Sequence, residues 1–165
     1  METALLDASS LISLARIDAL SYLVRLPWRL VTLAEIYHEV IIQGLAGCHP
    51  DVLIIKPYFE NQSIQIITTA IGVPYSGISV SDSCVIRTGH KQRCLVISND
   101  QGLVAKCRQY FPATNIQGSP SVILLLYQMK LISIVEARRL LQTLAKLNRV
   151  SKTNIERYLK ELVHD

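Results

Sequence analysis

The stretch Ala4-Leu5-Leu6-Asp7-Ala8-Ser9-Ser10-Leu11-Ile12 decides the fold of this chain. A short apolar run leads directly into an aspartate, two serines and a second apolar run. We interpret it as a buried strand, an acid at the strand's carboxyl end, and a helix capped by Ser9 or Ser10. A carboxylate has no place in an apolar core, but ligands of parallel α/β sheets bind beyond the carboxyl ends of the strands. The stretch therefore predicts an α/β fold with a functional site at Asp7.

The same pattern returns at Cys94-Leu95-Val96-Ile97-Ser98-Asn99-Asp100. A β-rich apolar run is followed by Asp100, and a helix is expected from about residue 102 to 110. One such acid is commonly no more than a helix cap. Two of them at strand carboxyl ends in one chain favour a shared site.

Two further acids lie on predicted helices. Thr32-Leu33-Ala34-Glu35 has the spacing of a capping box, and the helix that it starts continues to Gly44. Glu39 has no capping role one turn further on; a mid-helix glutamate is usually only solvated, and Glu35 competes with it as a site residue. Ser79-Val80-Ser81-Asp82 repeats the cap spacing, so Asp82 is either a first-turn residue favoured by the helix dipole or a site residue.

The order of the predicted elements indicates the architecture. Short strands are expected at 30–31, 64–67 and 114–116, and helices alternate with the strands up to about residue 130. This alternation predicts a three-layer α/β sandwich with a short parallel sheet and helices on both of its faces. Two extra C-terminal helices follow, headed by Ser133 and Ser151. We expect a single domain over 1–165, with a core at about 1–130 and the C-terminal helices at 131–165.

Composition narrows the class of protein. Half of the residues are hydrophobic and the mean hydropathy is +0.29, which favours either a dense core or an apolar partner interface. No apolar run reaches the roughly 18 residues of a membrane span, and no basic, then apolar leader is present, so we expect a cytoplasmic protein without a membrane partner. The net charge of +4 is compatible with a nucleic-acid partner and equally with many ordinary proteins. The four cysteines lack zinc-site spacing, so reduced thiols are expected.

Four carboxylates in one pocket need a cation, because like charges at close range raise each other's pKa. Oxygen ligands without histidine or thiolate favour Mg²⁺ or Mn²⁺ over zinc. A metal of this kind lowers the pKa of a bound water and neutralises charge on a phosphoryl group, which suits hydrolysis of a phosphodiester. The sequence has no P-loop, no G-x-S-x-G and no G-x-G-x-x-G, so the usual nucleotide-binding and acyl-transfer classes lack their motifs.

The four acid-bearing segments resemble the four motifs of the PIN domain. They are Leu6-Asp7-Ala8-Ser9, Ile36-Tyr37-His38-Glu39-Val40, Val80-Ser81-Asp82 and Val96-Ile97-Ser98-Asn99-Asp100. The similarity covers nearly the whole chain and is especially close to the VapC-like branch, the ribonucleases of toxin–antitoxin pairs. It implies a Mg²⁺- or Mn²⁺-dependent endoribonuclease acting on RNA, with an antitoxin partner and a homodimeric assembly. It further implies metal-binding and catalytic roles for Asp7, Glu39, Asp82 and Asp100, and auxiliary roles for Ser9, Ser98 and Asn99, although Asn99 could equally just form the turn.

One motif departs from the PIN pattern, and the RNA contacts are left open. Relatives of this type often carry Gly-Glu at the third acid, where this chain has Ser81-Asp82 with a side chain one methylene shorter. Basic residues flank the acid junctions and are candidate RNA phosphate contacts, although such a cluster is more often ordinary surface: Lys91, Arg93, Lys106 and Arg108. The alternatives are a PIN scaffold or RNA-binding module that does not cut, and a nuclease of RNA processing or of structured DNA.

Overall fold

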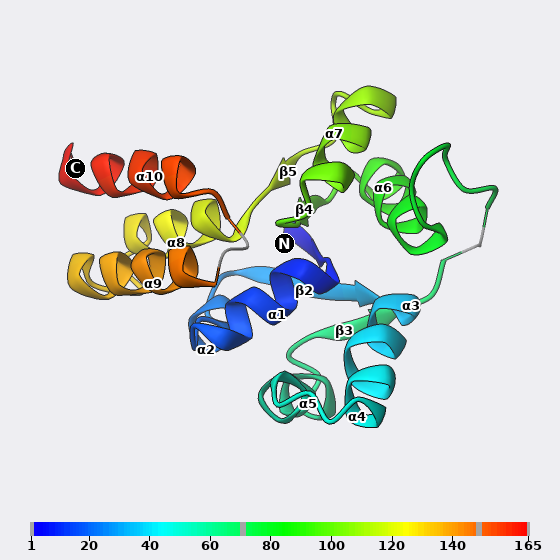
Figure 1. The fold of residues 1–165 in the computed structure, drawn as a ribbon, viewed down its shortest axis with the longest axis horizontal. Coiled ribbons are helices and arrows are strands. Elements are labelled where there is room, and N and C mark those ends of the chain that lie inside the picture. The colour runs from blue at the N-terminus through cyan, green and yellow to red at the C-terminus, as the bar shows by residue number, and fades with distance from the viewer. Residues whose placement is uncertain (1, 70–71, 148–149, 165) are drawn as a thin grey trace.

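A five-stranded parallel sheet forms the centre of the computed structural model, which describes residues 2–69, 72–147 and 150–164. The strand order is β3-β2-β1-β4-β5 (Figure 1). The strands are β1 (Glu2–Leu6), β2 (Trp28–Leu33), β3 (Gln65–Ile67), β4 (Leu95–Ile97) and β5 (Ile116–Gln117). The predicted α/β architecture with a short parallel sheet is confirmed.

The central strand β1 is the point where the chain changes direction across the sheet. From β1 the chain builds β2 and β3 on one side, and it then returns to add β4 and β5 on the other. Ligands of open parallel sheets bind at such a reversal of strand order. Leu6 is paired with Ile97 in the parallel register of β1 and β4. The residues that follow these two strands are therefore neighbours, although they are far apart in sequence.

The helices of the first half pack around α1 and the carboxyl edge of β2. They are α1 (Ala8–Arg16), α2 (Leu20–Leu23), α3 (Ala34–Tyr37), a segment of π-helix η1 (His38–Gln43), α4 (Gly44–Ala46) and α5 (Asp51–Glu60). The helix expected after Thr32 and up to Gly44 is thus three joined segments with a π-helical turn at its centre. Helix α1 contacts α5, and η1 contacts both of them.

Strand β2 is longer than predicted, and this overturns the capping box expected at Thr32. Thr32 lies inside the strand, and its hydroxyl donates a hydrogen bond to the carbonyl of Leu6 at 2.8 Å. Leu33, not Thr32, precedes the first turn of α3. The prediction was wrong because it used local spacing alone, whereas pairing with β1 holds Thr32 in an extended conformation.

The second half adds α6 (Val80–Gln92), α7 (Gln101–Tyr110), α8 (Ser119–Gln128), α9 (Ile134–Lys146) and α10 (Lys152–His164). Helices α8, α9 and α10 pack on one another at one end of the molecule, and α8 also contacts α1 and α2 (Figure 1). The predicted C-terminal helices therefore pack on the sandwich. Ser133 caps α9 by accepting the backbone N–H of Glu136 at 3.1 Å, as its spacing predicted.

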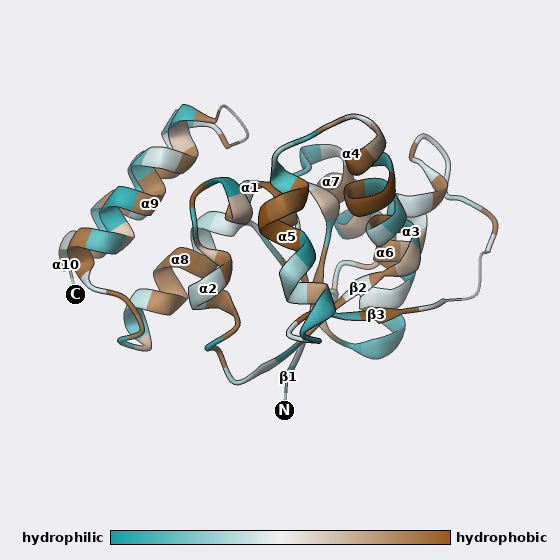
Figure 2. Cartoon of the chain, turned by 90° about the horizontal axis from the view of Figure 1, so that it is seen from below, coloured by the Kyte–Doolittle hydropathy of each residue, from teal (hydrophilic) through white to brown (hydrophobic). Residues whose placement is uncertain are grey.

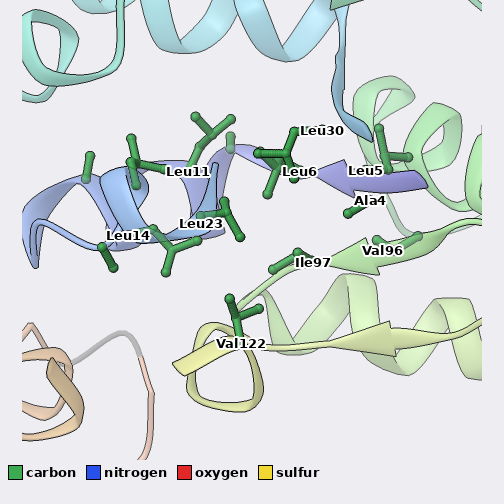
Figure 3. Close-up of a cluster of buried hydrophobic side chains, with 14 of the residues drawn as sticks. Ala4, Leu5, Leu6, Leu11, Leu14, Leu23, Leu30, Val96, Ile97 and Val122 are labelled. Carbon is green, nitrogen blue, oxygen red and sulfur yellow. The ribbon is translucent and has the colours of Figure 1, made fainter. Parts of the chain in front are cut away.

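The core lies where the apolar runs of β1 and β4 meet α1. Leu5, Leu6, Val96 and Ile97 are fully buried. Figure 3 shows side chains of β1 and β4 beside those of α1, with Val122 of α8 close to Ile97. Helix α8 is mostly apolar and α9 is banded, as expected for an inner and an outer helix (Figure 2).

Two expectations from composition can be compared with this fold. Within the described ranges, every helix is too short or too polar to cross a lipid bilayer. All four cysteines are free thiols; Cys84, Cys94 and Cys107 are buried and Cys48 is exposed.

Candidate active site

Asp7 is the first residue after β1 and serves as the N-cap of α1. Its Oδ2 accepts the backbone N–H of Ser9 at 3.4 Å and the Ser9 hydroxyl at 2.6 Å. A third hydrogen bond to Oδ2 comes from the Ser98 hydroxyl at 2.7 Å. The prediction that Ser9 or Ser10 caps this helix was wrong, because both serines lie within its first turn. Ser10 instead donates to the carbonyls of Asp7 and Ile97, and so ties the ends of β1 and β4 together.

The Ser98 hydroxyl links Asp7 to the second acid junction. It donates to the Asp7 carboxylate and accepts the backbone N–H of Asp100 at 3.1 Å. The Asp100 carboxylate caps α7, with Oδ1 accepting the N–H of Leu103 at 2.9 Å, and its side chain remains exposed. Both aspartates are therefore helix caps, as the conservative interpretation held, and both are hydrogen-bonded to Ser98 at the same edge of the sheet. That they form one functional site stays a prediction.

Glu39 and Asp82 interact electrostatically with Asp7. Burial, with 4% of Asp7 exposed, raises the pKa of its carboxyl, and the charge of Asp82 raises it further; the hydroxyls of Ser9 and Ser98 oppose this shift. The pKa of Glu39 is raised by partial desolvation and by the charges of Asp7 and Asp82. Acids from β1, η1 and α6 thus share one region of negative potential.

The π-helical turn η1 carries Glu39, whereas its competitor Glu35 lies on α3. A π-helical turn within an α-helix frequently occurs at a functional site. Oε2 of Glu35 is buried, and it has no hydrogen-bond partner among the residues that the structure describes. The charge coupling to Asp7 and Asp82 favours Glu39 as the site residue.

Asp82 lies in the first turn of α6, which Ser79 caps. The Ser79 hydroxyl accepts the backbone N–H of Asp82 at 3.0 Å. That bond uses only the backbone of Asp82, so its carboxylate is left to interact with Asp7 and Glu39. The two interpretations of Asp82 are therefore compatible.

Asn99 has a positioning role between the acid junction and α8. Its Oδ1 accepts the N–H of Ser119 at 2.9 Å, and its Nδ2 donates to the Ser119 hydroxyl at 2.8 Å. Its backbone N–H donates to the hydroxyl of Ser9 at 3.0 Å. Gly118 holds the N-cap position of α8, and the Ser119 side chain beside it binds Asn99.

The candidate RNA contacts differ in their distance from the acid junctions. Lys91 and Arg93 lie at the end of α6 opposite Asp82, just before the amino end of β4, so the fold places them away from the acids. The Lys106 ammonium lies 5.9 Å from the centre of the Tyr110 ring. Arg108 lines a cavity together with Ser98 and Asn99, beside the acid junction.

Sequence reasoning missed a second feature beside the site. Arg16 forms a bidentate ion pair with Asp51, with Nε–Oδ1 at 2.9 Å and Nη2–Oδ2 at 2.6 Å. The two residues line a cavity of about 290 Å³ that Glu39 and His49 also border. No local signal could have revealed the pair, because its members are 35 positions apart.

The side-chain oxygens at the carboxyl edge of the sheet are of the chemical type that binds a hard divalent cation. They are carboxylate and hydroxyl oxygens, the ligands that Mg²⁺ and Mn²⁺ prefer. Desolvation is the main cause of the raised pKa values of Asp7 and Glu39; the charge of Asp82 adds to both, and that of Asp7 adds to Glu39, and a bound cation would offset these unfavourable contributions. However, within residues 2–69, 72–147 and 150–164 no three histidine, cysteine or acidic side chains are close enough together to hold a metal ion. The acids are gathered at one edge without forming a complete coordination sphere.

A family model described as a PIN domain matches residues 3–164. The chain belongs to the PIN domain family. PIN domains are generally nucleases, and PIN nucleases typically use divalent metals, which agrees with the acids gathered at Asp7. No curated protein matches this PIN domain.

Proposed function

We propose that this PIN domain is a metal-dependent endoribonuclease that hydrolyses phosphodiester bonds of RNA. One observation carries the proposal: Asp7 is a nearly buried carboxylate at the carboxyl end of the central strand, and its pKa is raised by burial and by the charge of Asp82. No lysine, arginine or histidine in the described part of the chain forms an ion pair with Asp7, Glu39 or Asp82. An uncompensated cluster of this kind is unfavourable for folding, and its presence favours a cation-binding role.

The residues of the cluster have distinct roles in this proposal. A Mg²⁺ or Mn²⁺ ion would draw Asp7, Glu39 and Asp82 together around it, with Asp100 at the rim, because no three acidic side chains of the described residues are close enough to hold an ion as they stand. The metal would supply an activated water and neutralise charge on the phosphoryl group. Ser9 and Ser98 hold Oδ2 of Asp7, and all hydrogen bonds to this carboxylate from described residues are on that one oxygen. Oδ1 is therefore the oxygen of Asp7 that is available to a ligand.

The test is cleavage by the purified chain of a labelled single-stranded RNA, with single- and double-stranded DNA in parallel. We expect cleavage of RNA with Mg²⁺ or Mn²⁺ and none with EDTA. Asp7→Asn is expected to abolish it while the protein remains folded. Metal-independent cleavage, or full activity of Asp7→Asn, would contradict the proposal. Cleavage of DNA alone would show that the substrate is DNA and not RNA.

A second candidate is a PIN module that binds RNA without cutting it. The observation that favours it is the incomplete coordination sphere among the described residues. The same assay separates the two candidates, because a binding module retains RNA in a gel-shift experiment with Mn²⁺ present and leaves the RNA intact.

A toxin role, with an antitoxin and a homodimeric assembly, completes the proposal. It is supported by the resemblance of the acidic motifs to the VapC-like branch and by exposed apolar side chains on elements that contact one another. These side chains are Ile42 on η1, Leu45 on α4, and Leu53 and Ile54 on α5. Expression in a bacterial host should arrest growth, and Asp7→Asn should remove the arrest; normal growth with active protein would argue against a toxin. Light scattering gives the number of copies in the assembly.

A further inference from the structure

A polar cavity lies beyond the carboxyl ends of β4 and β5, on the side of Ser98 away from β2. Its volume is about 300 Å³, at the lower end of the range for small-molecule sites. Ser98, Asn99 and Gln117 line it at the ends of the strands, and Arg108 of α7 lines it at one side. Helix α10 closes the opposite side with Asn154 and Arg157.

The charged residues that line the cavity are basic. Arg108 and Arg157 both line it, and its described lining contains no aspartate or glutamate; Glu161 lies outside the lining, 3.6 Å from Arg157. The Arg157 side chain is 63% exposed, and its guanidinium lies over the Tyr158 ring, 4.8 Å from the ring centre. An arginine fork of this kind binds phosphate oxygens through two parallel N–H donors.

Tyr158 limits what the cavity can recognise. Its side chain is 9% exposed, and its hydroxyl is hydrogen-bonded to the hydroxyl of Ser121. A buried ring already covered by Arg157 offers no free face for stacking a base. The remaining groups are guanidinium, amide and hydroxyl donors, which contact phosphate and sugar and carry no direct sequence information.

Ser98 and Asn99 connect this cavity to the acidic cluster. The Ser98 hydroxyl is 2.7 Å from Oδ2 of Asp7, and the same residue lines the cavity. Asn99 lines it too, with its side chain locked to Ser119. The wall between the negative site and the positive cavity is thus about one residue thick.

We propose that this cavity is a phosphate-binding subsite, in which Arg108 and Arg157 hold a backbone phosphate of the single-stranded RNA beside the phosphodiester that is cleaved. The proposal rests on the proposed function, because it assigns the cavity to the same substrate. It adds α10, and Arg157 in particular, to the substrate-binding surface. It also explains why arginines and acids lie so close together. The RNA strand needs basic side chains where its phosphate is held, and acidic metal ligands where it is cut.

The experiment measures binding separately from cleavage. Fluorescence anisotropy with a labelled single-stranded RNA of about ten nucleotides is recorded in EDTA, where no metal-dependent cleavage occurs. We expect Arg108→Ala and Arg157→Ala each to weaken binding about 10-fold, and each to reduce the slope of log K against log salt by about 0.7, the value for one contact to a single strand. Arg138→Ala removes an equal charge from the exposed surface of α9 and should leave both quantities unchanged.

Glu161→Gln is a control variant that should change the affinity for RNA in the opposite direction. Glu161 pairs with Arg157 at 3.6 Å, so its neutralisation should free the guanidinium and tighten RNA binding about 2-fold. Loss of folding cannot produce a gain in affinity, so this variant tests the subsite even if Arg157→Ala is unstable. Equal weakening by Arg138→Ala, or no effect of all three cavity variants, overturns the subsite.

Competition distinguishes a strand from a free ligand. Inorganic phosphate and a nucleoside monophosphate are titrated against the labelled RNA, and each should compete only at concentrations at least about 100-fold above that of unlabelled RNA. Competition by the mononucleotide as strong as that by the strand would overturn the assignment in favour of a free nucleotide. RNA binding that depends on Arg108 and Arg157, without any cleavage, would support the subsite and reject the nuclease. RNA cleavage that Arg108→Ala and Arg157→Ala leave unchanged would support the nuclease and reject the subsite.

Discussion

The hydroxyl of Ser98 donates a hydrogen bond of 2.7 Å to Oδ2 of Asp7, across 91 positions of sequence. The pairing of Leu6 with Ile97 in adjacent strands makes this contact possible, because it places the next residue of each strand side by side. The same hydroxyl accepts the backbone N–H of Asp100. Ser98 therefore determines how the two acid junctions are positioned relative to each other, and it has a central place in the predictions below.

Ser98→Ala should weaken both the fold and the site. It removes the hydroxyl bonded to Asp7 and leaves the Asp100 N–H without its acceptor, and such losses at buried sites cost about 1–3 kcal/mol. We also expect RNA cleavage to fall about 10-fold, the size of a positioning effect. Urea unfolding and a cleavage assay measure the two effects.

Ser13→Ala is the matched control, since this buried serine donates to the carbonyl of Ser9 and has no hydrogen bond to an acid among the described residues. It should lower stability without a specific loss of activity. Equal activity losses in the two variants would mean that Ser98 acts only through stability.

Asp7→Asn should abolish activity and stabilise the protein. The variant removes a desolvated charge that Asp82 and Glu39 repel, while the amide oxygen can still accept from Ser9 and Ser98. We expect activity to fall by at least about 100-fold. The melting temperature in EDTA near neutral pH should rise by about 2–4 °C, the shift that 1 kcal/mol produces in a chain of this size.

Asp18→Asn changes the same chemical group at an exposed position and should have little effect on cleavage. If Asp7→Asn instead unfolds the protein, Asp7 is needed as a helix cap, and the charge-repulsion argument is wrong.

The contribution of Asp7 and Glu39 to the stability of the metal-free protein should decrease as the pH rises above the ordinary carboxyl pKa values. Both carboxyls have pKa values raised above their ordinary values of 3.8 and 4.5, chiefly by desolvation. The folded state therefore binds their protons more tightly than the unfolded chain does. Their stabilising contribution is complete below the ordinary values and is lost as the pH passes the raised ones.

The difference in unfolding free energy between wild type and Asp7→Asn, measured at a series of pH values, isolates this effect from other carboxyls. The advantage of Asp7→Asn should grow with pH. A constant difference would show that Asp7 is not strained by its charge.

Divalent metal should offset the loss of stability that the ionised Asp7 and Glu39 cause. Mg²⁺ or Mn²⁺ binding to the folded protein adds RT ln(1 + [L]/Kd), which is about 2.7 kcal/mol at 100 times Kd. The melting temperature of wild type should rise with metal, and that of Asp7→Asn should rise far less. Removal of the metal with EDTA should restore the original value. Equal shifts in both proteins would place the metal elsewhere.

Glu39→Gln and Glu35→Gln should separate the two competing glutamates. Glu39 is coupled to Asp7 and Asp82, so its neutralisation should lower cleavage by about 10- to 100-fold. Glu35→Gln should leave cleavage near wild type, and its effect should appear in stability because Oε2 is buried. The reverse order in a cleavage assay would assign the site to Glu35.

Much of the fold could be predicted from local pattern. The apolar runs before Asp7 and Asp100 are the central strands β1 and β4, and the cap spacings at Ser79 and Ser133 are capped helices. The errors occurred where a distant partner overrides local spacing. Thr32 has a capping pattern but donates to Leu6 of the adjacent strand, and Ser10 donates to Ile97 of β4 instead of capping α1. Such contacts leave no mark within a short window of sequence.

The sequence by itself determined which acids follow which strands, because a carboxylate after an apolar run has to remain outside the core. It also determined the family to which the chain belongs. Only the tertiary structure decided that Ser98 is hydrogen-bonded to Asp7, that the charges of Asp7 and Asp82 reach Glu39, and that Arg157 lines a cavity shared with Ser98. The physical reason is that strand register and helix packing bring these groups together across long loops of chain, and this depends on the whole core and not on any one segment.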